Sequence, residues 1–119
     1  MLVEKGFKGL LKHLNTTNQE TLDSIVSILF NTLAKTTDTI VKKFLNISHS
    51  LHYCYLALSK IHSTSRVNEM IMILLKCIIV RGGFEGLLLK KLLTQFRNNN
   101  HQTSNDDLKK FIPIIQQLI

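Results

Sequence analysis

Residues 67–80 read VNEMIMILLKCIIV, and this segment decides the fold. Only three of these residues are polar, so a helix formed by the segment is apolar on nearly every side. A helix without a polar face belongs in the middle of a core. Ser63-Thr64-Ser65 precedes it with residues that cap helices, and Gly82-Gly83 stops it because glycine most easily takes a left-handed conformation. We therefore predict a central helix that other helices cover.

Apolar residues at helical spacing predict further amphipathic helices on both sides of this segment. They cover residues 3–14, 22–33, 40–61 and 84–96, and a last helix follows Ser104. Thr17 and Glu20 have the spacing of a capping box and predict how the second of these helices begins. The predicted fold class is all-α, with five to seven helices in a single domain over residues 1–119.

Three local features refine this outline. Residues 38–62 fit either one long helix or two, and Ser48-His49-Ser50 favours two because serine competes for backbone hydrogen bonds inside a helix. Asn98–Thr103 is predicted to be a loop. Pro113 falls inside the last helix, where it predicts a kink because proline lacks a backbone donor.

The chain is basic, with 15 Lys and Arg against 8 Asp and Glu and a net charge of +7. Such a charge attracts acidic peptides, nucleic acid or anionic lipid. The lysines are scattered, which is typical of solvated helix faces. The longest apolar run, Met70–Leu75, is far shorter than the roughly 18 residues of a membrane span, and no signal peptide is visible. We expect no membrane span and a cytoplasmic or nuclear location.

Residues capable of catalysis or metal binding do not form a recognisable set. His49 and His52 share a helix face, but Cys54 falls on the apolar stripe, so the ligands that zinc needs do not converge. Cys54 and Cys77 both lie in apolar helical surroundings, where buried free thiols are usual. Neither a phosphate-binding glycine loop nor a nucleophile motif is present. We expect no cofactor, no metal and no enzymatic activity.

One motif occurs twice. Gly6-Phe7-Lys8-Gly9-Leu10-Leu11 recurs as Gly83-Phe84-Glu85-Gly86-Leu87-Leu88, and each copy is followed by a polar loop and a capped helix. The offset is close to two periods of about 40 residues, which is the repeat length of helical solenoids.

On these residues the chain resembles armadillo and HEAT repeat proteins. Val3–Leu14 looks like the turn and second helix of an armadillo repeat, whereas Leu29-Phe30-Asn31 and Ala57–Ile61 look like its third helix. The resemblance covers about half the chain and implies that Asn31 and Lys60 line a concave groove for an extended peptide. Lys60 stands where the family has asparagine, and the family's proline early in the second helix is missing. A solenoid-like fold and a compact helical bundle both remain open.

The function that we expect is a non-catalytic scaffold or adaptor module that binds a peptide segment or another subunit, and an acidic partner is one of the options. The alternative is a basic helical domain that binds nucleic acid. The candidate binding residues are Asn31, Lys42, Lys43, Lys60, Lys90 and Lys91, and Tyr53 is the aromatic residue most exposed by its position off the apolar stripe. The apolar helices would also allow a homo-oligomer or a hetero-oligomer. The apolar end, Ile114–Ile119, fits either a docked last helix or a piece of a longer repeat protein, and we favour the second.

Overall fold

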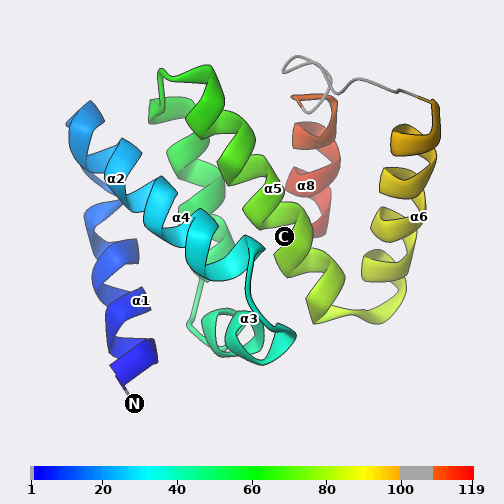
Figure 1. The fold of residues 1–119 in the computed structure, drawn as a ribbon, viewed down its shortest axis with the longest axis horizontal. Coiled ribbons are helices and arrows are strands. Elements are labelled where there is room, and N and C mark those ends of the chain that lie inside the picture. Colours follow the sequence, from blue (N-terminus) through cyan, green and yellow to red (C-terminus); the bar gives the residue numbers. More distant parts are fainter. Residues whose placement is uncertain (1, 100–108) are drawn as a thin grey trace.

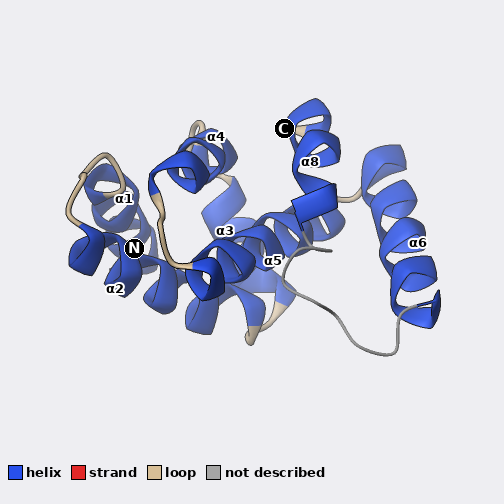
Figure 2. Cartoon of the chain, turned by 90° about the horizontal axis from the view of Figure 1, so that it is seen from above, coloured by secondary structure: helices blue, strands red, loops and turns tan. Residues whose placement is uncertain are grey.

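The computed structural model describes residues 2–99 and 109–119, and all regular structure within these ranges is helical (Figure 2). The predicted all-α class is therefore confirmed. The helices are α1 (Leu2–His13), α2 (Gln19–Leu29), α3 (Asp38–Leu45), α4 (Ser50–Ala57), α5 (Thr64–Arg81), α6 (Gly83–Asn99) and α8 (Ile112–Leu118). Short helical turns adjoin three of them: η1 (Phe30–Ala34), η2 (Leu58–Lys60) and η3 (Lys109–Phe111).

The central helix is α5, as the apolar segment predicts. It crosses the middle of the molecule and contacts α2, α3, α4, α6 and α8 (Figure 1). Met70, Ile71, Ile73, Leu74 and Ile78 are completely buried there. A single cluster of buried apolar residues includes members from α1 to α8. The fold thus depends on one core around α5.

The way the helices surround α5 favours the compact-bundle alternative. In a solenoid each repeat contacts only its neighbours along the chain, whereas α5 contacts helices that precede and follow it by several elements. The two copies of the repeated motif also have different surroundings. Phe7 is buried, with its ring centroid 5.1 Å from that of Phe44, but Phe84 is 79% exposed. Of the polar loop and capped helix that should follow the second copy, residues 100–108 lie outside the described residues. Asn98 and Asn99, predicted to be loop, belong to α6, and the end of the predicted helix is α8.

The segment between residues 38 and 62 is split, as the polar cluster predicts. Helix α3 ends at Leu45 and α4 begins at Ser50. Between them His49 has a φ of 61°, in the left-handed region. This sharp corner turns α4 back toward α1, and the contact between α1 and α4 creates the groove described below.

Two predicted helix details are wrong. The N-cap of α2 is Asn18, whose Oδ1 accepts a hydrogen bond from the Thr21 amide at 3.0 Å, and the Thr17–Glu20 capping box does not form. Pro113 does not kink a helix, because it occupies the first turn of α8. Its missing N–H costs nothing at that position, since the first amides of a helix have no intrahelical partner.

Helices α5 and α6 meet at a tight corner. Gly82 has φ 78° and ψ −153°, and Gly83 has φ 74°, which are conformations that other residues rarely adopt. One turn later Gly86 lies against the end of α5. A Cβ atom added at Gly86 would come within 3.0 Å of the Ile78 carbonyl oxygen. The corner and the close approach together seat α6 on α5.

The last helix is docked on the core. Ile115 of α8 is completely buried, and the Arg81 guanidinium donates a hydrogen bond of 2.6 Å to the Leu118 carbonyl oxygen. The apolar character of Ile114–Ile119 is therefore explained in part by contact with α5.

Candidate functional site

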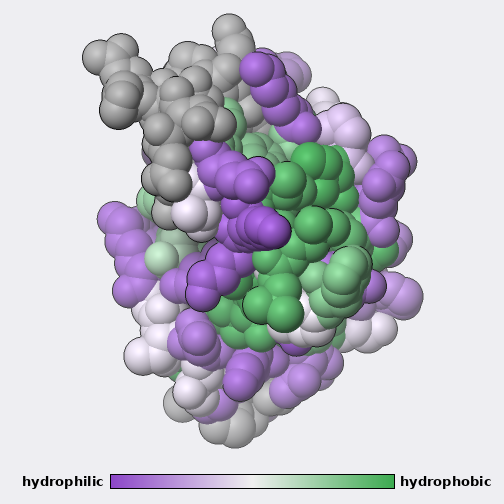
Figure 3. Space-filling model, turned by 90° about the vertical axis from the view of Figure 1, so that its right-hand side faces the viewer, coloured by the Kyte–Doolittle hydropathy of each residue, from purple (hydrophilic) through white to green (hydrophobic). Residues whose placement is uncertain are grey.

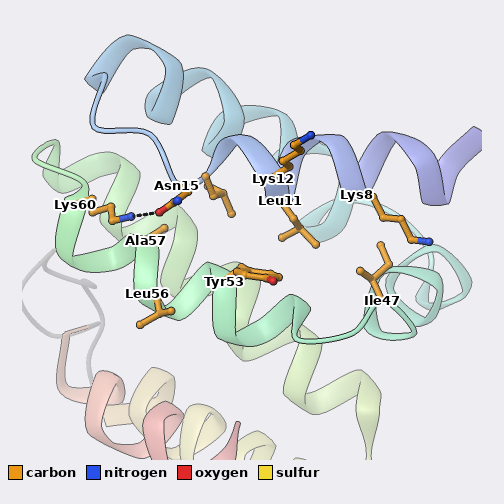
Figure 4. A pocket seen from close by; sticks show the side chains of 10 residues that line it. Lys8, Leu11, Lys12, Asn15, Ile47, Tyr53, Leu56, Ala57 and Lys60 are labelled. Atoms are coloured by element: carbon orange, nitrogen blue, oxygen red, sulfur yellow. Dashed lines mark hydrogen bonds between the residues drawn. The ribbon is translucent and has the colours of Figure 1, made fainter.

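A groove of about 450 Å³ lies between α1 and α4 (Figure 4). We call it the α1–α4 groove. Leu11 of α1 points toward Tyr53 of α4, and the turn after α1, the α3–α4 link and η2 complete the wall of the groove. The residues that line it are Lys8, Leu11, Lys12, Leu14, Asn15, Ile47, Tyr53, Leu56, Ala57 and Lys60.

The floor of the α1–α4 groove is apolar and belongs to the core. Leu11, Leu14 and Ala57 are all buried. Above them, Tyr53 and Leu56 are three residues apart on α4, so both stand on one helix face. Tyr53 is 47% exposed, as predicted, and Leu56 is 56% exposed. The groove therefore offers an aromatic ring and an aliphatic side chain that a ligand could cover.

The rim carries three positive charges. Lys8 and Lys12 are four residues apart on α1, and both are exposed. Lys60 lies at the other end, where its Nζ donates a hydrogen bond of 3.0 Å to Asn15 Oδ1. None of the residues lining the groove is acidic. This charge pattern suits a partner with carboxylates beside its apolar groups.

Gln19 fixes the position of Lys60. The Gln19 side-chain Nε2 donates a hydrogen bond of 2.7 Å to the Lys60 backbone carbonyl oxygen. Its Oε1 accepts a hydrogen bond of 3.1 Å from the His62 backbone N–H. One side chain at the start of α2 thus holds the link between η2 and α5 through both of its polar atoms. The backbone that carries Lys60 is consequently fixed at the end of the groove.

The concave surface extends beyond the groove toward the α3–α4 corner. Lys8, Asn46, Ile47 and Ser48 line an adjoining depression of about 450 Å³. Lys8 and Ile47 belong to both surfaces. The two concave surfaces therefore adjoin at Lys8 and Ile47.

A second cavity, of about 380 Å³, lies where α3, α5 and α6 meet. We call it the α3–α5–α6 cavity. Lys42, Lys76 and Lys90 contribute to its lining, one from each helix, and Asp38 is the acidic residue among the lining residues. Lys76 is held in place because its Nζ donates a hydrogen bond of 2.9 Å to the Thr36 carbonyl oxygen.

The six predicted binding residues separate into three groups. Lys60 lines the α1–α4 groove, and Lys42 with Lys90 lines the α3–α5–α6 cavity. Asn31 is exposed on η1, Lys43 is half-buried on α3 and Lys91 is exposed on α6. These last three line neither the groove nor the cavity. The structure therefore does not place Asn31 and Lys60 in a common groove.

Sequence reasoning did not select Lys8, Lys12, Leu56 or Lys76. The exposure of Leu56 could have been predicted, because Leu56 shares a helix face with Tyr53 and lies off the apolar stripe of its segment. The two lysines of α1 look like ordinary solvated residues until α4 is known to pack beside them.

The thiols and imidazoles form no reactive site within residues 2–99 and 109–119. Cys54 and Cys77 are both buried and free, as predicted. Burial raises the pKa of both thiols, that of Cys77 to about 12, so both stay protonated and unreactive at neutral pH. The His49 and His52 rings lie 6.1 Å apart edge to face. No group of three metal-binding side chains converges in the described part of the chain.

Comparison with known protein families, with curated proteins and with solved structures found no match. In the parts of the chain described above, every helix is too short or too polar to cross a lipid bilayer.

Proposed function

We propose that this chain is a non-catalytic α-helical interaction module that binds an acidic peptide segment of another protein in the α1–α4 groove. The observation that carries the proposal is the combination, in one groove, of an apolar floor, two half-exposed apolar side chains and three rim lysines. Protein interfaces are built in this way, with apolar anchors in pockets and charges around them.

The apolar part of the groove would supply most of the affinity. Burying one leucine or phenylalanine side chain of the peptide stabilises a complex by about 1.5–3 kcal/mol. Tyr53 and Leu56 would be covered in the same step, and each is about half exposed before binding. Exposed charge pairs contribute less, about 0.2–1 kcal/mol each, so the lysines mainly steer and select the peptide.

The resemblance to armadillo repeats supports the same class of partner, because those proteins hold peptides in a groove. Lys60, which the resemblance would make a groove residue, lines the α1–α4 groove. Asn31, which the resemblance would make a groove residue, is not among the residues lining this site.

Nucleic-acid binding is less well supported. It requires lysines and arginines along one face, usually with aromatic side chains for stacking. Here Lys60 belongs to the groove, Lys42 and Lys90 to the α3–α5–α6 cavity, and Lys43 and Lys91 to neither. These lysines therefore do not line one basic groove that a phosphate backbone could follow.

A displayed library of random peptides tests the proposal. We expect selection on the full chain to enrich peptides that combine Asp or Glu with at least two leucine or aromatic residues. The control is Tyr53→Ser with Leu56→Ser, which removes the apolar wall from two exposed positions and leaves the core intact. Enriched peptides should bind this variant at least about tenfold more weakly, because one buried anchor corresponds to roughly that factor.

Two results would overturn the proposal. One is a failure to enrich any peptide above an empty support. The other is an enriched set that binds the Tyr53→Ser, Leu56→Ser variant as tightly as the original chain. Circular dichroism of the variant, which should match the original, shows that a loss of binding does not come from unfolding.

A further inference from the structure

Helix α6 presents an apolar surface to solvent. Phe84 is 79% exposed, Leu87 is 71% exposed and Leu88 is 42% exposed. Figure 3 shows the side of the molecule that α6 forms, and a broad apolar area covers part of it. Soluble domains seldom leave contiguous apolar side chains exposed unless these residues contact something.

The α5–α6 corner places two of these residues at an edge of the molecule. Gly82 and Gly83 make the corner tight through their positive φ angles, and α6 starts immediately after it (Figure 1). Phe84 and Leu87 lie three residues apart in the first turns of α6, so both project from one side. Two large apolar side chains that project from an edge can enter the interfacial layer of a lipid bilayer while the rest of the fold stays in place.

Positive charge lies directly beside this pair. Leu87 is itself part of the lining of the α3–α5–α6 cavity, together with Lys42, Lys76 and Lys90. Lys91 is exposed one helical turn after Leu87. The acidic residues nearby are Asp38 in the cavity and Glu85 on α6, so positive charge predominates.

We propose that Phe84, Leu87 and the lysines of the α3–α5–α6 cavity form a peripheral binding surface for anionic lipid bilayers. Phe84 and Leu87 enter the interfacial layer of the membrane, where apolar side chains gain from burial. Lys42 and Lys90 contact the phosphates and carboxylates of the headgroups, which attract basic residues near a charged leaflet. This surface is separate from the α1–α4 groove and does not depend on the function proposed for it.

Two other polyanionic or apolar partners fit the surface less well. A nucleic acid would gain from stacking on Phe84, but Leu87 and Leu88 are aliphatic and offer no stacking face. A second copy of this chain would bring two molecules of charge +7 together, and like charges oppose such contact. An anionic bilayer satisfies the aliphatic residues and the lysines at once.

Vesicle co-sedimentation tests the proposal. We expect the full chain to bind vesicles of phosphatidylcholine with one quarter phosphatidylserine, and to bind pure phosphatidylcholine vesicles much more weakly. Phe84→Ser with Leu87→Ser should lower the partition coefficient at least about tenfold, because the buried apolar area is lost. Lys42→Ala with Lys90→Ala should lower it about fivefold for each lysine, and added salt should do the same to the original chain.

The matched control is Tyr53→Ser with Leu56→Ser, which removes the same kinds of side chain at the same spacing from α4. This variant should bind vesicles as the original chain does, since Tyr53 and Leu56 line the other site. Equal binding to neutral and anionic vesicles, or full binding by the Phe84→Ser, Leu87→Ser variant, would overturn the proposal. So would complete displacement by soluble glycerophosphoserine, or binding to a single-stranded RNA more tightly than to anionic vesicles.

Discussion

The repeated glycine motif provides a matched pair of substitutions that tests how α6 sits on α5. Gly9 and Gly86 occupy equivalent positions in the two copies, and both lie in helices. An added Cβ at Gly9 would meet no other atom within 4 Å, whereas at Gly86 it would lie 3.0 Å from the Ile78 oxygen and 3.2 Å from the Ile79 oxygen. Those two oxygens belong to backbone, which cannot move aside as a flexible side chain would.

We expect opposite effects on the free energy of unfolding. Gly→Ala in a helix interior stabilises by about 0.5–1 kcal/mol, because alanine loses less conformational entropy on folding. Gly9→Ala should show this gain. Gly86→Ala has the same intrinsic gain, but forcing a methyl group into a packed contact costs about 1–3 kcal/mol. Gly86→Ala should therefore be less stable than Gly9→Ala by about 1–3 kcal/mol.

Urea unfolding followed by circular dichroism measures the difference directly. The intrinsic helix gain cancels between the two variants, so the difference in midpoint reports the contact with α5 alone. If both variants were stabilised to the same extent, α6 could not approach the end of α5 as closely as the structure has it.

Three further predictions concern the core and the α3–α4 corner. Leu74→Ala should lower the free energy of unfolding by about 2–5 kcal/mol, because Leu74 is completely buried. Met72 is on the same helix but is 38% exposed, so Met72→Ala should lower the free energy of unfolding far less. Equal urea midpoints for Leu74→Ala and Met72→Ala would show that α5 is not at the centre of the core. The thiols of Cys54 and Cys77 should resist a thiol reagent at pH 8 until the chain is unfolded in urea. In the unfolded chain the two thiols lose their protons near pH 9, whereas in the folded chain the pKa of Cys77 is about 12 and that of Cys54 is also raised. Their contribution to stability is thus fully present below pH 9 and is lost as the pH rises toward 12, which melting curves at pH 8 and 10 should show as a lower melting temperature at the higher pH. His49→Gly should raise the free energy of unfolding by about 1 kcal/mol. The left-handed conformation costs a residue other than glycine about 1–2 kcal/mol, and the larger conformational entropy that glycine loses on folding offsets part of the relief. A destabilised His49→Gly would show that the His49 side chain contributes more than its backbone costs.

Features that depend on local periodicity were predictable from the sequence. The position of α5 follows from residues 67–80, which leave no polar face for solvent. The division between α3 and α4 follows from the polar cluster around His49. Both depend on residues close together in the chain.

Details at helix ends were less predictable, because several adjacent residues can perform the same role. Thr17 and Asn18 can both cap a helix, and the choice shifts the start of α2 by one residue. The position of Pro113 within its helix was unpredictable for a related reason. A proline in the first turn and a proline in the interior look alike when the start of the helix is not known.

The α1–α4 groove could not be predicted, because it depends on contact between two helices far apart in the sequence. The lysine pairs show the same limit. Neighbours on a helix point about 100° apart, and of Lys42 and Lys43 only Lys42 lines the α3–α5–α6 cavity. Lys42 lines the α3–α5–α6 cavity together with Lys90, which belongs to a helix three helices later in the chain. Only the packing of α3 and α6 on α5 brings these two side chains together.

Amide chemical-shift mapping with the tightest peptide from the selection is the most direct test of the central claim, which is that the α1–α4 groove binds an acidic peptide. We predict that the largest shifts fall on α1 and α4, around Lys12 and Tyr53, and that residues of η1 near Asn31 and of α6 near Phe84 stay unchanged. The shifts on α1 and α4 should vanish in the Tyr53→Ser, Leu56→Ser variant. Shifts centred on Asn31 or on α6, with α1 and α4 unaffected, would contradict the account.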